Sequence, residues 1–394
     1  KRVLKLNKAL YGLKQAPRQW NKTIDQFMRK LGYRPLRSDP CVYTKLTRTN
    51  KLMMLSLYVD DTVIVFHRDD TDEWNQDKVA IAHAYAIKDL GECNWILNMK
   101  VTRNRQDRTI TLSQQAYVER ICKEFNVENG RVINTPVDTN NLYSPSDGSP
   151  PVPLDRNKSE MYRSIVGALL YAANITRIDI AYAVGQLCRH TATPCVHHLE
   201  SARRVLRYVS NTSHLGLVFG RTKLDLSECR LDVYCDADWG GDRYDGKSNT
   251  GCVVRFNGDV MNWVSKKQTS VAMSSAEAEY IAMAEAVKEA LWYRSWILEV
   301  LDKKITANII CDNEAAIKLS SNDTIHDRSK HIRLRYHFIR DEKAKNHITV
   351  SWIRSAKQQA DILTKALDKG PFQRLTEKLM THMGMNSNMK EEER

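Results

Sequence analysis

The chain has 394 residues, of which 42% are hydrophobic, and 60 Lys and Arg against 47 Asp and Glu give a formal net charge of +13. This length allows two or three domains, and the positive charge favours nucleic acid as a partner. The apolar stretch 165–175 is too short to span a membrane, and nine cysteines without a paired spacing indicate reduced thiols inside a cell.

The first predicted element is an amphipathic helix that begins near Ala16 and ends at Gly32. Strands and a second helix near 70–88 are expected to follow, with another strand pair between 94 and 113. The apolar side chains of the first helix recur on one face, and they are Trp20, Ile24, Phe27, Met28 and Leu31.

The stretch "LSLYVDDTVIVF", residues 55–66, predicts two short strands with Asp60 and Asp61 at the tip between them. One interpretation is an ordinary polar hairpin turn, since Asp is common in turns. The other is a divalent-metal site, because hard cations such as Mg²⁺ prefer carboxylate oxygens. The stretch alone does not decide between them.

Residues 135–158 are rich in Pro, Ser, Asp and Asn and predict an extended linker. A helical pattern follows from about 160 to 210. Its Arg203, Arg204 and Arg207 fit either a solvated helix face or a surface that follows a phosphate backbone.

In the last 170 residues, acids recur where predicted elements begin or end. Asp236 ends a strand, Glu279 lies in the first turns of a long helix that Ser274 and Glu277 would cap, and Asp312 ends another strand. A further helix is expected to carry Asp361. Each acid alone is ordinary, but four of them over a β-β-β-α-β-α order form a specific pattern that can converge on one point.

That order and the segments "YCDADWGGD", "CDNEAAIKL" and "QQADILTKAL" resemble the ribonuclease H domain of copia-type LTR retrotransposon Pol polyproteins. Upstream, "YGLKQAPRQW", "LYVDDTVIV" and "ARRVLRYV" resemble the reverse transcriptase and connecting region of the same family. The resemblance implies an α/β (α+β) fold: a partial reverse transcriptase palm and a helical thumb or connection, then a ribonuclease H-like fold with a five-stranded mixed sheet and flanking helices.

The resemblance also implies site roles. Asp236, Glu279, Asp312 and Asp361 would bind two Mg²⁺ ions, with Mn²⁺ as a substitute, which activate a water and stabilise the departing 3′ oxygen of an RNA strand. Asp60 would be a metal ligand of the polymerase, with Asp61 beside it. Asp238 and Glu277 are not assigned as ligands, and Trp239 is expected in the core rather than stacked on a base. The candidate nucleic-acid contacts are Lys14, Gln15, Arg18, Arg203, Arg204, Arg207, Arg333 and Arg335.

The expected domains are the partial palm at 1–134, the linker at 135–158, the helical connection at 159–224, the ribonuclease H domain at 225–370 and a charged tail at 371–394. The remaining palm carboxylate of the family lies upstream of "YGLKQAPRQW", where the ten residues before Tyr11 include no acid. With Lys1 in place of an initiator Met, we expect a piece of a longer protein that does not polymerise DNA alone.

The implied partners are an RNA:DNA hybrid, template RNA, nascent DNA, and the Gag, protease and integrase parts of a polyprotein, with no membrane. The expected location is intracellular, in a cytoplasmic virus-like particle with entry to the nucleus as an option. The alternative is a decayed or co-opted element that only binds nucleic acid. A transposase or integrase, which uses a related fold, is disfavoured by the polymerase motifs upstream.

Overall fold

The computed structural model describes residues 6–127, 132–139, 151–222, 228–242, 244–321 and 333–382. Contacts between Cα atoms divide the chain into two compact units, Lys1–Cys93 with Ser295–Asp302 and Asn94–Arg294 with Lys303–Arg394. We call these the first and second units and describe each by itself. Within the described ranges, no helix combines the length and apolar character needed to cross a membrane.

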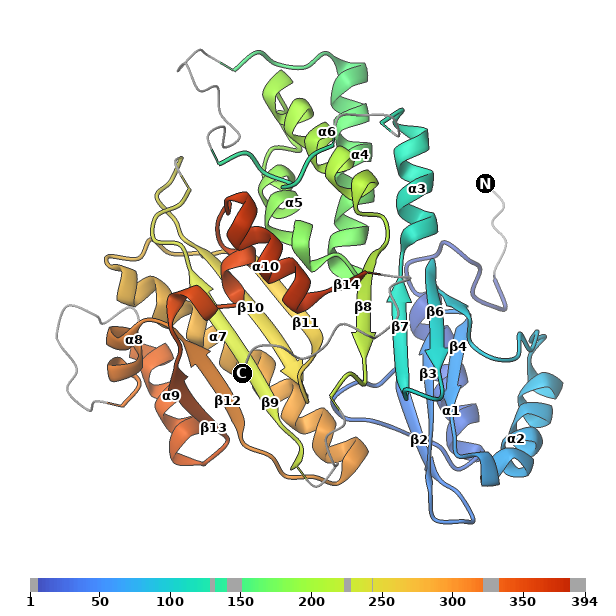
Figure 1. Cartoon of the computed structure of the whole chain (residues 1–394). Coiled ribbons are helices and arrows are strands. Elements are labelled where there is room, and N and C mark those ends of the chain that lie inside the picture. The colour runs from blue at the N-terminus through green and yellow to red at the C-terminus, as the bar shows by residue number, and fades with distance from the viewer. Residues whose placement is uncertain are drawn as a thin grey trace. The chain divides into compact units, whose positions relative to one another are not determined.

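The first unit is built on an antiparallel sheet in the order β1-β2-β3-β4 (Figure 1). The apolar helix face predicted from the sequence is confirmed, because Ile24 and Met28 are buried against this sheet and Trp20, Phe27 and Leu31 pack around them. The elements are α1 (Ala16–Lys30), β1 (Arg34–Pro35), β2 (Val42–Leu46), β3 (Leu52–Tyr58), β4 (Asp61–Val65), η1 (Arg68–Asp70) and α2 (Thr71–Ala84).

The second unit holds two sheets, and the first has the order β14-β8-β7-β6-β5. Its β7 pairs with β8, so the 95–113 strands belong with residues near 215 and not with the first unit, although the sequence placed them in a palm ending at 134. Backbone pairing across a hundred residues is not visible in a local pattern. The strands are β5 (Trp95–Ile96), β6 (Met99–Asn104), β7 (Thr109–Ser113), β8 (Leu215–Phe219) and β14 (Thr381–His382).

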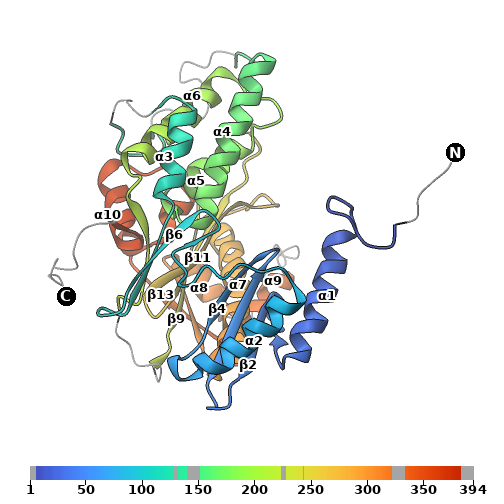
Figure 2. The same cartoon turned by 90° about the vertical axis from the view of Figure 1, so that its right-hand side faces the viewer.

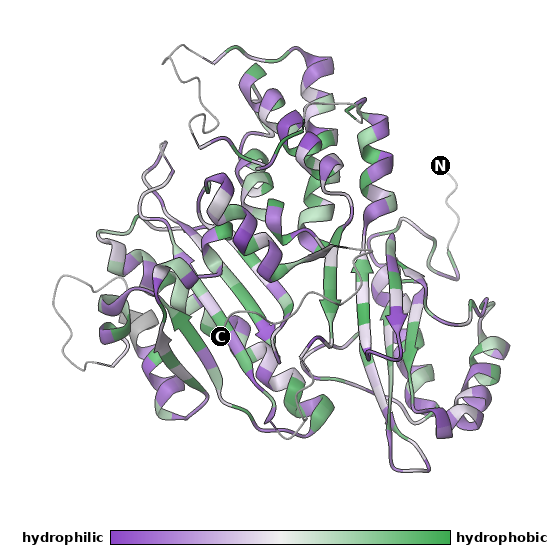
Figure 3. Cartoon of the chain, in the orientation of Figure 1, coloured by the Kyte–Doolittle hydropathy of each residue, from purple (hydrophilic) through white to green (hydrophobic). Residues whose placement is uncertain are grey.

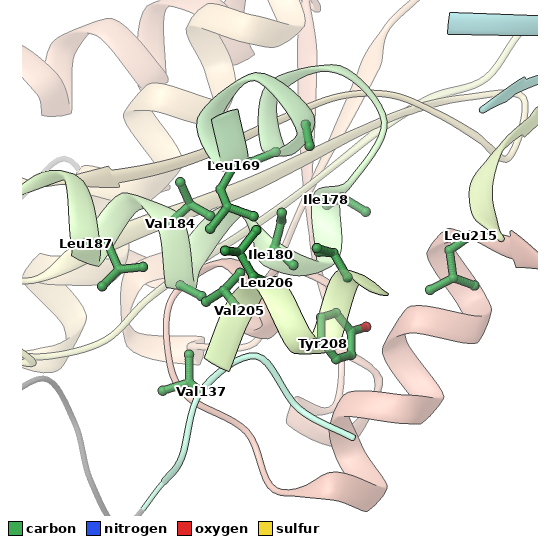
Figure 4. Close-up of a cluster of buried hydrophobic side chains, with 14 of the residues drawn as sticks. Val137, Leu169, Ile178, Ile180, Val184, Leu187, Val205, Leu206, Tyr208 and Leu215 are labelled. Carbon is green, nitrogen blue, oxygen red and sulfur yellow. The ribbon is translucent and has the colours of Figure 1, made fainter. Parts of the chain in front are cut away.

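A helical layer packs around a large apolar core in this unit, and Figure 4 shows its side chains pointing toward one another. Val137 belongs to this core, so part of the predicted linker is packed against protein; residues 140–150 lie outside the described residues. The elements are α3 (Gln115–Glu124), α4 (Arg156–Ile175), η2 (Ile178–Ile180), α5 (Ala181–Cys188) and α6 (Val196–Asn211).

The second sheet is mixed and has the order β11-β10-β9-β12-β13. Strands β9, β10 and β11 are antiparallel neighbours, whereas β12 runs parallel to both β9 and β13. The elements are β9 (Leu231–Ala237), β10 (Asn249–Phe256), β11 (Asp259–Lys267), α7 (Ser275–Leu301), β12 (Ala307–Cys311), α8 (Glu314–Leu319), α9 (Arg333–Ala344), β13 (Ile348–Trp352), η5 (Ser355–Lys357), η6 (Ala360–Leu363) and α10 (Lys369–Leu379).

Residues 369–379, at the start of the expected charged tail, form helix α10, which is packed and not merely solvated. Its Phe372, Leu375 and Leu379 are buried in the same core as Val253 of β10. Figure 3 shows green, apolar segments interspersed with white and purple ones along the strands of the mixed sheet and along the surrounding helices. The apolar spacing within "PFQRLTEKL" explains the burial.

A buried ion pair joins the helical layer together. Arg177 and Asp179 are each 1% exposed, and the guanidinium donates to both carboxylate oxygens at 2.9 and 2.8 Å. The same arginine donates to the carbonyl and hydroxyl oxygens of Thr212, while Tyr208 donates to Asp179 at 2.7 Å. Every charged group in this network therefore has partners, which a buried charge requires.

Replacing Arg177 by Met should destabilise the protein by about 3–5 kcal/mol, because the Asp179 carboxylate would stay buried without its counter-charge. Urea denaturation of the parent and the variant measures this difference. Arg156→Ala is the control, since that side chain is 89% exposed and its loss should change stability by no more than about 0.5 kcal/mol. Equal stability of Arg177→Met and the parent would contradict the role of this pair.

Candidate metal centre

The four predicted acids come from four elements of the second unit. Asp236 lies near the end of β9 and is 2% exposed, Asp312 directly follows β12, Glu279 lies near the start of α7, and Asp361 lies in η6. Strands β9 and β12 are parallel neighbours (Figure 1). Asp236 and Asp312 therefore lie at the same edge of the sheet.

The structure brings these side chains together. Ligand atoms of Glu279, Cys311 and Asp312 all lie within 4.8 Å of one another. On the other side, the Lys365 ammonium is 3.0 Å from Asp361 Oδ1 and 3.8 Å from Asp236 Oδ2. The hydroxyl of Thr364 also donates to Asp236. Helices α7 and α8 are also labelled in Figure 2, where the view of Figure 1 is turned by 90°.

The electrostatics of the cluster oppose ionisation. Burial, followed by the charge of Asp236, raises the pKa of Glu279 to about 11. The same two causes raise the pKa of Asp361 to about 7, although Lys365 acts against them. Oxygen donors that repel one another when ionised suit a hard divalent cation, whose charge would favour their ionised forms. The cluster is therefore a possible metal site.

Close packing fixes the position of η6, and hence of Asp361, against β10. A Cβ atom added to Gly251 would lie 2.6 Å from Thr364 Cγ2 and 2.8 Å from the Ala360 carbonyl oxygen, closer than side chains tolerate. From neighbouring strands, Asn249 Nδ2 and Ser265 Oγ both donate to the Leu363 carbonyl, at 2.8 and 2.7 Å. Only glycine allows this approach of sheet and 3₁₀ turn.

Capping bonds position the start of α7 and Glu279 with it. The Glu277 N–H donates to Ser274 Oγ at 3.2 Å, and the Glu277 carboxylate accepts from the Met273 N–H at 2.9 Å. The predicted pairing of Ser274 and Glu277 at the helix start is confirmed. Asp238 likewise has a local partner, because its carboxylate accepts from the Asn249 N–H, while burial raises its pKa to about 6.

One expectation beside the cluster is wrong. Trp239 is 60% exposed and therefore not part of the core, and its indole N–H donates to the Ala272 carbonyl. Sequence reasoning also missed Lys365, whose signal was its place four residues after Asp361, in the loop between η6 and α10. Cys311 was missed as well, although it directly precedes Asp312.

The second acidic group lies on the β3–β4 hairpin of the first unit. Tyr58 pairs with Asp61, which leaves Val59 and Asp60 as a two-residue turn. Both Asp60 and Asp61 are exposed, as the sequence predicted for the tip. Val59 has a φ of 55°, an uncommon value for a β-branched residue, and its carbonyl accepts from Trp20 Nε1 at 3.0 Å.

The candidate nucleic-acid contacts differ in exposure. Lys14, Gln15 and Arg18 are exposed around the start of α1. Of the three arginines on α6, Arg203 is exposed and Arg207 half-buried, whereas Arg204 is bonded to Thr135 Oγ1 at 3.1 Å and lies 3.7 Å from Asp138. These three therefore do not form one uniform basic face. The side chains of Arg333 and Arg335 lie outside the described residues.

The strand order of the mixed sheet, with acids at the ends of its parallel strands, is that of a ribonuclease H-like fold. A family model described as reverse transcriptase (RNA-dependent DNA polymerase) matches residues 1–139. The chain is 39% identical over 387 residues to the retrovirus-related Pol polyprotein from transposon TNT 1-94 of Nicotiana tabacum, covering 98% of this chain and 28% of that polyprotein.

The transposon Ty5-1 protein of Saccharomyces cerevisiae is 33% identical, with 73% of this chain and 89% of that protein covered. The chain belongs to the copia-type retrotransposon Pol polyprotein family. Among solved structures, the foamy viral protease-reverse transcriptase in complex with dsDNA matches with a TM-score of 0.47 and 12% identity, over 88% of this chain and 60% of that one.

Gly251→Ala should weaken metal binding at the cluster, because the added methyl group displaces η6 and Asp361. Gly167→Ala is the control, since nothing lies within 4 Å of a Cβ at that helical position. The rise in melting temperature on adding Mg²⁺ measures binding. The same rise in Gly251→Ala as in the parent would show that the close approach does not position Asp361.

Proposed function

We propose that this chain hydrolyses the RNA strand of RNA:DNA hybrids as a ribonuclease H that uses two Mg²⁺ ions. The observation that carries the proposal is the convergence of Asp236, Glu279, Asp312 and Asp361 from four elements on one edge of the mixed sheet. The raised pKa of Asp361 and of Glu279 supports it, because strongly perturbed carboxyl groups cluster at functional sites.

In this proposal the four carboxylates hold the ions, and Mn²⁺ can substitute for Mg²⁺. When bound, such ions activate a water and stabilise the departing 3′ oxygen. Asp236 and Asp312 hold their oxygens at fixed strand ends, and Glu279 approaches from the capped start of α7. Lys365 compensates part of the negative charge on the Asp361 side, at 3.0 Å from that carboxylate.

The β3–β4 hairpin of the first unit fits DNA synthesis and not RNA hydrolysis. We assign Asp60, with Asp61 beside it, to metal binding in RNA-directed DNA polymerisation by the longer polyprotein, which acts on template RNA and nascent DNA. Gag, protease and integrase regions are the partners expected from the polyproteins that the chain resembles. These steps would take place inside the cell, in a virus-like particle.

Asp312→Asn should reduce Mg²⁺-dependent cleavage of a labelled RNA:DNA hybrid by about 100-fold or more, because one ligand charge is lost while the shape is kept. Hybrid binding should persist. Asp302→Asn, a change at an exposed acid after α7, is the matched control and should cleave like the parent. Asp60→Asn should also leave cleavage unchanged.

Two results would contradict the proposal. Equal cleavage by Asp312→Asn and the parent would remove Asp312 from the site. Binding of the hybrid by the parent chain without any Mg²⁺-dependent cleavage would favour the alternative, a nucleic-acid binder that depends on the basic surface alone. Such binding would weaken with salt and would not respond to loss of the four carboxylates.

The effect of Mg²⁺ on stability should depend on pH. The raised pKa of Asp238, about 6, and of Asp361, about 7, means that the folded protein holds these protons more tightly than the unfolded chain. Without metal, these groups therefore stabilise the fold at low pH, and the contribution is lost as pH rises toward 7. Mg²⁺ bound at the cluster would favour the ionised form of Asp361, so its stabilising effect grows as pH rises toward 7.

Thermal unfolding at pH values from about 5 to 8, with Mg²⁺ or with EDTA, measures this dependence. The increase in melting temperature caused by Mg²⁺ should be larger at the upper end. In Asp361→Asn, which has no carboxylate to ionise at this position, the pH dependence should be reduced. If the increase in melting temperature caused by Mg²⁺ did not depend on pH in the parent, this result would contradict the assignment of Asp361 as a ligand.

A further inference from the structure

Two large aromatic side chains beside the acidic cluster are unusually exposed. Trp239 is 60% exposed and Trp352 is 50% exposed. Trp239 continues into an exposed apolar surface with Val271 and Met273, which are 47% and 77% exposed. Exposed apolar surface next to a functional site commonly marks a contact with a ligand.

Both rings are held in place by hydrogen bonds, one to the segment before α7 and one to Asp312. Trp239 Nε1 donates to the Ala272 carbonyl at 3.1 Å, and Ala272 packs against Ala278, the neighbour of Glu279. Trp352 Nε1 donates to the carbonyl of Asp312 itself, also at 3.1 Å. The bonded indole N–H groups fix the rings, while half or more of each side chain stays open to a ligand.

The two rings come from the ends of two strands, β9 and β13, that have β12 between them. Trp352 pairs with Cys311 in parallel register at the end of β13, and Trp239 follows the end of β9 by two residues. Strand β12, which leads into Asp312, lies between β9 and β13. With neighbouring strands about 4.8 Å apart, the outer two strand ends are separated by roughly 10 Å, a span of about three nucleotides along one strand.

We propose that Trp239 and Trp352 bind sugars and bases of the hybrid beside the scissile phosphate. The inference rests on the proposed function, because the hybrid that the two rings would bind is the substrate that the acidic cluster is proposed to cleave. Aromatic faces accept any base or sugar, so this contact would be independent of sequence. It adds an uncharged contribution to the attraction that a chain of net charge +13 has for phosphates.

The test measures the affinity for a fluorescently labelled RNA:DNA hybrid in EDTA, by anisotropy over a series of salt concentrations. Trp239→Ala and Trp352→Ala should each weaken binding by about fivefold or more, and the Phe variants should retain most of the affinity. The slope of log affinity against log salt should not change, because no charge is removed.

Trp95→Ala is the matched control, because Trp95 is 55% exposed but lies on β5 of the other sheet. It should bind like the parent. Parent-like binding by both Trp239→Ala and Trp352→Ala would overturn the inference, and so would an equal loss in Trp95→Ala, which would indicate a general effect of removing exposed tryptophans.

Cleavage by the parent chain in Mg²⁺, measured on the same hybrid, separates this inference from the proposed function. If the parent does not cleave but the two variants bind more weakly, the proposed hydrolysis fails while the aromatic contacts stand. If the parent cleaves and both variants bind and cleave normally, the aromatic contacts fail while the hydrolysis stands.

Discussion

Mutual repulsion among carboxylates at one edge of the mixed sheet is the constraint on which the second unit depends. Four acids are held together against burial and like charge, which is why Glu279 and Asp361 retain their protons at elevated pH. Neighbouring features offset this repulsion: the Lys365 ammonium, the capping bonds of α7, and the glycine that lets η6 approach β10. The arrangement costs stability locally, and it suits the cation site that we propose.

The required rigidity comes from the packing behind the site. Arg177 and Asp179 fix the junction of α4, η2 and α6, and the core around them continues into Val253 of β10 and Leu363 of η6. Trp263 of β11 donates to the Ala173 carbonyl of α4 at 2.8 Å, which ties the helical layer to the sheet. The helical layer therefore supports the element that carries Asp361, although it contributes none of the four acids.

The sequence placed Asp236, Glu279 and Asp312 near the ends of elements whose apolar pattern is clear, whereas the helix expected around Asp361 is the short 3₁₀ turn η6. It also predicted the exposed Asp60 and Asp61 at the hairpin tip. Trp239 was placed wrongly, since an aromatic residue after a buried strand has the composition of a core position, and only the backbone path turns its ring outward. Likewise, the pairing of β7 with β8 depends on long-range contacts that no local pattern contains.

The turn at Val59 sets two requirements against each other. A β-branched residue with a φ of 55° costs free energy, on the order of 1–2 kcal/mol, and the pairing of Tyr58 with Asp61 and the bond from Trp20 hold it there. Glycine at this position would relieve the backbone but widen the range of conformations open to the adjacent Asp60. Glycine at position 59 would therefore favour stability, whereas Val59 favours a fixed position for the Asp60 carboxylate.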